Sequence, residues 1–213
     1  MDFTFSITLV ITAITVIVSL LGFNSQKVIE DLIFYGPAIS KRNQYYRFIT
    51  CGFIHADFMH LAFNMLAFYT FGIGLEKGLF ANPDIFGNEA PFYFIMLYIG
   101  GLIISSVPDY FKHKDDYHFR SLGASGAVSA IIFSCIVLYP TMQISFFFIP
   151  IRGWIFGLIY LGISAYLNKQ GGGNINHGAH LWGAIFGIAY TLLFVSLKGE
   201  INVLQNFITA IRG

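Results

Sequence analysis

The chain has 213 residues, of which 56% are hydrophobic and only 11% are charged, and its formal net charge is +1. A soluble domain carries about a quarter charged residues, so this chain is too apolar to be covered by water on all sides. The small net charge gives no electrostatic reason to expect nucleic acid as a partner. The composition therefore predicts an integral membrane protein in contact with the lipid bilayer.

A spanning helix needs about 20 largely apolar residues. The first such run is Phe3–Phe23, which carries no charge and lacks the basic start of a signal peptide, so we interpret it as a retained transmembrane helix. Residues 24–54 mix charged and apolar side chains, which predicts a long first loop with amphipathic pieces at the membrane interface. A second helix is expected over His55–Leu75, followed by a polar loop over 76–91.

The second half of the chain predicts four more helices. The third helix, Phe92–Val107, should stop at Pro108, because proline removes a backbone donor and restricts the residue before it. The remaining expected segments are helices over Ser125–Tyr139, Gly153–Leu167 and His177–Leu197, an interfacial segment over 141–150 and an amphipathic tail over 198–213. We thus predict an all-α membrane protein with six spanning helices, in one domain over residues 1–213 whose core is about 45–197.

The expected helix over Ser125–Tyr139 is short, because Pro140 follows it. At about 1.5 Å per residue it is roughly 22 Å long, less than the hydrocarbon core of about 30 Å. One of its ends must therefore stop below the membrane surface, where irregular backbone is covered by protein or lines a water-filled cavity. If that end is the first one, Ser125 is sunk below the surface but reachable by water.

Gly123-Ala124-Ser125-Gly126 places this serine at the start of the short helix. Glycines let the backbone turn tightly into a helix, and the unpaired N–H groups of a helix start can hold a developing oxyanion. Ser125 is therefore a candidate nucleophile. The alternative is structural, since serine is a favoured N-cap and Gly126 with Ala130 fits a small-residue packing motif.

His180 lies one turn before Gly183, which forms a GxxxG face with Gly187. A helix packed tightly through these glycines presents His180 to its neighbour, because the three residues lie on nearly one face. If the neighbour is the short helix, the imidazole meets the Ser125 hydroxyl and can activate it. The alternative for His180 is a structural polar contact between helices.

His60 and Asn64 are four residues apart and share one face of the second helix. Both side chains can donate hydrogen bonds, and a donor aimed at a developing oxyanion contributes roughly 10²–10³ in rate in known cases. Hydrogen bonding between helices is the structural alternative. Asp57 is the carboxylate closest to this group, but a charge at a helix N-terminus explains it better than a catalytic triad.

The histidine spacings do not match a metal site. His55-x4-His60 differs from the i, i+4 pair of HExxH and has no accompanying glutamate, and His177-x2-His180 lacks a partnering carboxylate. We therefore expect no metal and no cofactor.

Together, His55-x4-His60-x3-Asn64, Gly123-x-Ser125-Gly126 and Ala179-His180-x2-Gly183-x3-Gly187 resemble the motifs of the rhomboid intramembrane serine proteases, in the same order along the chain. The resemblance covers about residues 45–190. It implies a rhomboid-like bundle that cleaves peptide bonds in or near the transmembrane segments of membrane proteins. The roles it implies are nucleophile for Ser125, general base for His180, and oxyanion stabilisation for His60, Asn64 and the Ser125 backbone N–H.

The resemblance also implies supporting residues and contains departures. Structural support is expected from Gly123, Gly126, Gly183, Gly187, Arg47 and Glu76. Tyr46 stands where the family has tryptophan in a Trp-Arg pair. Ser129 stands where some members carry a tyrosine that packs under the histidine, so the sequence leaves open what orients His180.

Two alternatives belong to other functional classes. One is a non-catalytic rhomboid-like protein that binds transmembrane segments, and the other is a small transporter that uses the polar cluster as a substrate path. The location predicted from the sequence is the bacterial inner membrane.

Overall fold

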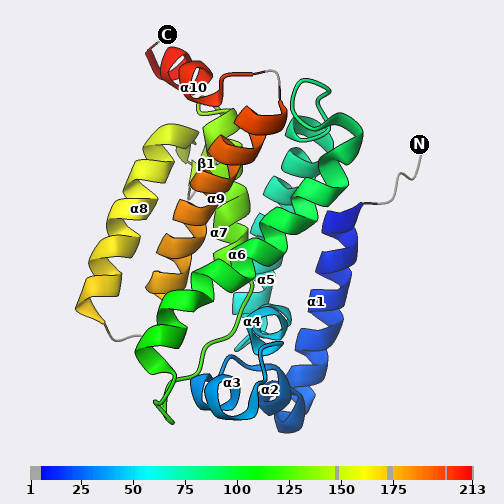
Figure 1. The fold of residues 1–213 in the computed structure, drawn as a ribbon, viewed down its shortest axis with the longest axis vertical. Helices are drawn as coiled ribbons and strands as arrows, with labels where there is room; N and C mark the ends of the chain where they lie inside the picture. The colour runs from blue at the N-terminus through cyan, green and yellow to red at the C-terminus, as the bar shows by residue number, and fades with distance from the viewer. Residues whose placement is uncertain (1–5, 147–148, 172–174, 200, 213) are drawn as a thin grey trace.

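The computed structural model describes residues 6–146, 149–171, 175–199 and 201–212, which form an α-helical bundle (Figure 1). The helices that run along the bundle are α1 (Ile7–Asn24), α5 (Phe58–Ile73), α6 (Ala90–His113), α7 (Ser125–Leu138), α8 (Gly153–Gln170) and α9 (His177–Lys198). The predicted start of the first helix, Phe3, lies outside the described residues. Inside them the chain enters α1 through Ser6, whose hydroxyl accepts a hydrogen bond from the Leu9 N–H at 3.4 Å.

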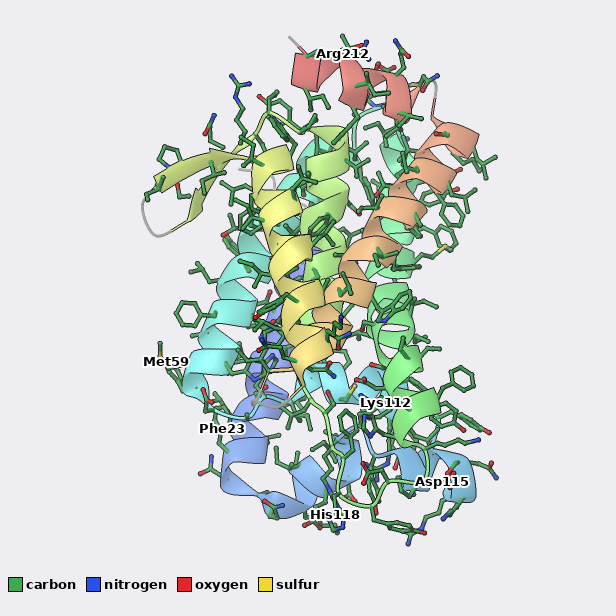
Figure 2. The ribbon with its side chains drawn as sticks, turned by 90° about the vertical axis from the view of Figure 1, so that its left-hand side faces the viewer. Phe23, Met59, Lys112, Asp115, His118 and Arg212 are labelled. Atoms are coloured by element: carbon green, nitrogen blue, oxygen red, sulfur yellow. The ribbon has the colours of Figure 1, made fainter. Side chains whose placement is uncertain are left out.

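Four segments of the described chain are long and apolar enough to cross a membrane: Ile7–Asn24, Phe58–Leu79, Gly87–His113 and His177–Lys198. Helix α7 has 14 residues, as short as the sequence predicted, and α8 has 18. The labelled polar side chains in Figure 2 lie toward the two ends, with Lys112, Asp115 and His118 at one and Arg212 at the other. The all-α membrane fold is confirmed, while the number of six spans stays a prediction.

The first loop is helical in short pieces, which agrees with the amphipathic segments expected there. It contains α2 (Gln26–Leu32), α3 (Gly36–Arg42), α4 (Arg47–Thr50) and the 3-10 turn η1 (Cys51–Phe53), gathered at one end of the bundle (Figure 1). Arg47 is buried and ties the pieces together. Its guanidinium donates to the carbonyl oxygens of Glu30 and Ile33 at 2.8 and 2.7 Å.

Helix α5 differs from its predicted limits at both ends. It begins at Phe58 rather than His55, because the Asp57 side chain caps it by accepting from the His60 N–H at 2.8 Å. It continues past Leu75 as a π-helical segment, η2 (Gly74–Leu79), where a polar loop was expected. A 3-10 turn, η3 (Gly87–Glu89), then leads into α6.

The π-helical segment carries Glu76, which is buried and holds the start of α1. Its carboxylate accepts hydrogen bonds from the backbone N–H groups of Ile7 and Thr8, both at 2.9 Å, and from the hydroxyls of Ser6 and Thr8, at 3.0 and 2.7 Å. The two N–H donors are unpaired backbone groups of a helix N-terminus, where a negative charge is also favoured by the helix dipole. Glu76 therefore anchors α1 to α5.

Helix α6 runs through Pro108 to His113, so the predicted stop at Val107 was wrong. Proline costs a backbone hydrogen bond, but neighbours in a membrane bundle can compensate for it. The turns beyond the proline have such a neighbour in the first loop, because the Tyr110 ring packs edge-on against Phe48 with centroids 5.6 Å apart. Tertiary contacts therefore outweigh the local preference to end the helix.

The segment expected at 141–150 contains a β-hairpin that the sequence did not predict. Strands β1 (Gln143–Phe146) and β2 (Ile149–Arg152) are antiparallel, with Gln143 opposite Arg152. Figure 2 shows the hairpin projecting sideways from the bundle. The predicted amphipathic tail is a helix, α10 (Val203–Arg212), that crosses the same end of the bundle (Figure 1).

Helix α7 is the central element, and every residue from Gly126 to Val137 is buried. It contacts α9 backbone to backbone: a Cβ at Gly183 would overlap the Gly126 carbonyl, and one at Gly187 would overlap the carbonyl of Ala130. In Figure 1 the chain climbs from the end of α6 before α7 begins, so α7 starts part-way along the bundle.

Replacing Glu76 with alanine should destabilise the fold strongly, because four donors around the carboxylate lose their acceptor. The expected cost is about 3 kcal/mol of the free energy of unfolding, measured by denaturation in detergent. Glu89→Ala is the matched control, since Glu89 is exposed and its carboxylate lies 3.9 Å from the Lys198 ammonium group at the surface. Equal stability of the two variants would contradict the role of Glu76.

Gly183→Ala should separate α7 from α9, because the added methyl group has no space beside the Gly126 carbonyl. Overpacking of this kind costs about 1–3 kcal/mol, which we expect as a fall in the free energy of unfolding. Gly162→Ala is the control on α8, where no atom lies within 4 Å of the added Cβ. A Gly183→Ala protein as stable as the control would mean that the close contact is not required.

Candidate active site

The residues singled out at the start of α7 sit in a tight turn packed against α5. Gly123 has φ +112, a conformation that favours glycine, and its N–H donates to the Cys51 carbonyl at 2.9 Å. A Cβ at Gly123 would lie 2.8 Å from Cε1 and 3.0 Å from Nε2 of His60. Glycine therefore lets the His60 ring reach the backbone that leads into Ser125.

Ser125 is the first residue of α7 and is partly exposed. The first N–H groups of a helix have no partner inside the helix. Those at the start of α7 thus point out of its end beside the Ser125 side chain. This arrangement supplies donors for a negatively charged oxygen next to a hydroxyl group.

His55 also holds the turn that precedes Ser125. Its Nε2 accepts the Ala124 N–H at 3.4 Å, so the ring proton is on Nδ1, which is 3.0 Å from the Ser19 hydroxyl. That hydroxyl in turn donates to the Phe53 carbonyl at 3.0 Å. A neutral His55 thereby links α1, the first loop and the turn before Ser125.

His60 and Asn64 lie on one face of α5, as their spacing requires. His60 Nδ1 faces the Ala56 N–H at 3.5 Å, which leaves Nε2 as the donor on the side of Gly123. Asn64 is buried, and one of its amide protons goes to the His60 carbonyl at 3.0 Å, which leaves the second without an acceptor among the described residues. The structure therefore brings two candidate donors toward the start of α7.

His180 lies in the first turn of α9, close to the Gly183–Gly126 contact. No hydrogen bond joins its ring to the Ser125 hydroxyl, although both residues are within the described part of the chain. Its nearest aromatic neighbours are His177, with centroids 6.0 Å apart, and Tyr160 of α8, at 6.2 Å and nearly parallel, with an interplanar angle of 20°.

Tyr160 was missed by the sequence reasoning. Its hydroxyl is 2.7 Å from the Ser129 hydroxyl, which donates to the Ser125 carbonyl at 2.8 Å. The available signal was Ser129 itself, because a polar side chain on an otherwise apolar buried helix needs a partner. That the partner would come from α8 could not be read from spacing along the chain.

The start of α9 is fixed by Asn176. Its side-chain oxygen caps the helix by accepting from the Ala179 N–H at 2.9 Å, while its amide nitrogen donates to Asp109 of α6 and to the Ser121 hydroxyl. Asn176 therefore holds α9, α6 and the segment before Ser125 together. Within the described residues, no group of three or more His, Cys, Asp or Glu side chains could hold a metal ion.

Comparison with known proteins gives consistent matches. The Rhomboid domain model matches residues 42–197. The chain is 29% identical over 160 residues to RHOMBOID-like protein 12, mitochondrial, of Arabidopsis thaliana, which covers 68% of this chain and 45% of the relative. It is 30% identical over 147 residues to Rhomboid protein 1, mitochondrial, of Saccharomyces cerevisiae, which covers 67% and 40%.

A bacterial relative matches over more of its own length. The rhomboid protein YdcA of Bacillus subtilis is 30% identical over 161 residues, which is 73% of this chain and 70% of the relative. By contrast, the aligned part of the chain spans less than half of the two mitochondrial relatives. Since the family model matches well over half of the chain and the helices are those of a membrane bundle, the protein belongs to the rhomboid family of integral membrane proteins.

Proposed function

We propose that the protein is an intramembrane serine endopeptidase with Ser125 as nucleophile and His180 as general base. The observation that carries the proposal is the backbone contact of α7 with α9 through Gly126 and Gly183. This contact brings the first turns of both helices together at a depth where unpaired polar groups are costly. A serine and a histidine at such a contact form the pair that nucleophilic catalysis requires.

In the proposed reaction, His180 takes the proton of the Ser125 hydroxyl while Oγ attacks the carbonyl carbon of the scissile peptide bond. The C–N bond then breaks, and His180 returns the proton to the leaving amine. Water attacks the resulting ester in the same way, with His180 as base, and releases the second product and free Ser125. No metal or cofactor takes part in these steps.

The negative oxygen of each tetrahedral intermediate is assigned to three donors. They are the Ser125 backbone N–H, His60 Nε2 and the second amide proton of Asn64. The position of His60 against Gly123 and the orientation of Asn64 by the His60 carbonyl support this assignment. Donors fixed before the reaction lower the barrier because they need not reorganise when charge develops.

The proposed substrates are membrane proteins, cut in or near their transmembrane segments, because α7 begins inside an apolar bundle. The proposed location is the bacterial inner membrane, which the match to the Bacillus subtilis relative supports. Two of the relatives above carry mitochondrial names, so fractionation of the native cells is the measurement that decides the membrane.

Ser125→Ala should abolish cleavage of a transmembrane reporter in liposomes, because the attacking oxygen is gone. A fluorophosphonate probe should label the wild-type protein at Ser125 and leave this variant unlabelled. Ser134→Ala is the control: it removes a hydroxyl from the same helix, far from the site, where Ser134 bonds to Thr191 at 2.8 Å. Cleavage by Ser125→Ala would reject the protease and favour a transporter or a binder of transmembrane segments.

Asn64→Ala should lower kcat by about 10²-fold, the usual cost of one oxyanion donor. KM should change little, because this donor acts mainly on the transition state. Asn202→Ala, which removes an amide near α10, should leave both constants unchanged. A change confined to KM would instead place Asn64 in substrate binding.

A further inference from the structure

Helix α8 is joined to α7 by a hydrogen bond of one polar side chain, Tyr160. Gly153, Gly157 and Ser164 are the buried residues of α8, and the rest of this helix is half-buried or exposed. The Tyr160 hydroxyl nevertheless reaches Ser129, which is 2% exposed on α7. The Tyr160 ring extends from this hydrogen bond toward His180 of α9.

The hydrogen-bond directions along this contact follow from the acceptors. Ser129 gives its own proton to the Ser125 carbonyl at 2.8 Å, so it must accept the proton of the Tyr160 hydroxyl at 2.7 Å. The result is one chain of donors, from Tyr160 through Ser129 to the backbone of Ser125. This hydrogen-bond chain therefore fixes the Tyr160 ring relative to the backbone of Ser125, the proposed nucleophile.

The Tyr160 ring has aromatic neighbours in Phe133 and Phe156, with centroids 5.5 and 5.8 Å away, and it also lies beside the His180 ring. The Tyr160 and His180 rings are nearly parallel, at 20°, with centroids 6.2 Å apart. Within the described residues no carboxylate hydrogen-bonds to His180, so the orienting acid of a serine-protease triad has no counterpart here. A parallel aromatic ring is a suitable substitute, since it restricts the tilt of the imidazole.

We propose that Tyr160 is the positioning residue of His180, held in place by Ser129. The inference rests on the proposed function, because it assigns His180 the part of general base. It places the orienting group on α8, a helix that carries neither member of the dyad. The competing explanation is that Tyr160 only fastens α8 to α7.

Three variants at two tyrosines separate these explanations. Tyr160→Leu removes the ring and should lower kcat by about 10²-fold at nearly constant KM, the cost of a misplaced catalytic group. Tyr160→Phe keeps the ring and loses only its hydrogen bond, so kcat should fall by about fivefold. Tyr166→Leu is the matched control, because Tyr166 is exposed on the same helix and its hydroxyl accepts a hydrogen bond from Gln170 at 2.6 Å.

The hydrogen bond is tested by a double-mutant cycle. Ser129→Ala should lower kcat about as much as Tyr160→Phe, and the double variant should be no worse than either single variant, since each removes the same link. Additive losses of kcat in the double variant would contradict a functional link between the Tyr160 and Ser129 hydroxyls. A Tyr160→Leu protein with the kcat of Tyr160→Phe would overturn the positioning role of the ring.

A measurement without cleavage keeps this inference separate from the proposed function. In the NMR spectrum of protein labelled at histidine rings, the His180 signals, assigned with His180→Asn, sense the ring current of Tyr160. They should shift in Tyr160→Leu and stay nearly in place in Tyr160→Phe. If wild-type protein cleaves nothing but these shifts occur, the proposed function fails and the positioning holds; unchanged His180 signals in Tyr160→Leu overturn the inference.

Discussion

The backbone contact between α7 and α9 is the constraint on which the rest of the structure depends. The carbonyl groups of Gly126 and Ala130 on α7 come so close to α9 that a side chain does not fit opposite them, and α9 has Gly183 and Gly187 at these two places. Small residues allow such an approach in membranes, where helices associate through close packing rather than through the hydrophobic effect. Because α7 is short and buried all round, its position is set by these neighbours, and so is the distance between Ser125 and the first turn of α9.

Several polar side chains within the bundle have partners on other helices, which lowers the cost of placing polar groups in lipid. Glu76 joins η2 to α1, and Thr191 of α9 donates to Ser134 of α7 at 2.8 Å. These contacts lie away from the candidate site and hold helices in register. The contact of Tyr160 with Ser129 is also a hydrogen bond between helices. It differs from the others because the Tyr160 ring lies beside the His180 ring as well.

The sequence predicted features that depend on one helix at a time. The short α7 and the glycine face of α9 follow from spacing and residue type, and Asp57 was expected as a charge at a helix start, although that helix was expected to begin at His55. The pairing of α7 with α9 was a hypothesis from matching small residues, and the backbone contact confirms it. Features decided by distant contacts were missed. Helix α6 passes Pro108 because the first loop supports its last turns, and the π-helical segment continues α5 where Glu76 meets the start of α1. Tyr160 was missed for the same reason, since its partners are on α7 and α9.

The two members of the proposed dyad are held very differently. The segment leading to Ser125 is fixed from three sides, by the bridge of Ser121 to Phe34, by the Gly123–Cys51 hydrogen bond and by His55 against Ala124. The first loop is therefore part of the scaffold of the site and not only an interfacial connection.

The His180 ring has no hydrogen bond to another described residue, and its contacts are the faces and edges of rings. We therefore expect the imidazole rather than the serine to move when a Ser125–His180 hydrogen bond forms, because a parallel aromatic ring permits rotation in the imidazole plane while it resists tilting. A ring held in this way can turn toward the Ser125 hydroxyl when substrate excludes water, as expected for catalytic hydrogen bonds that tighten only in the substrate complex.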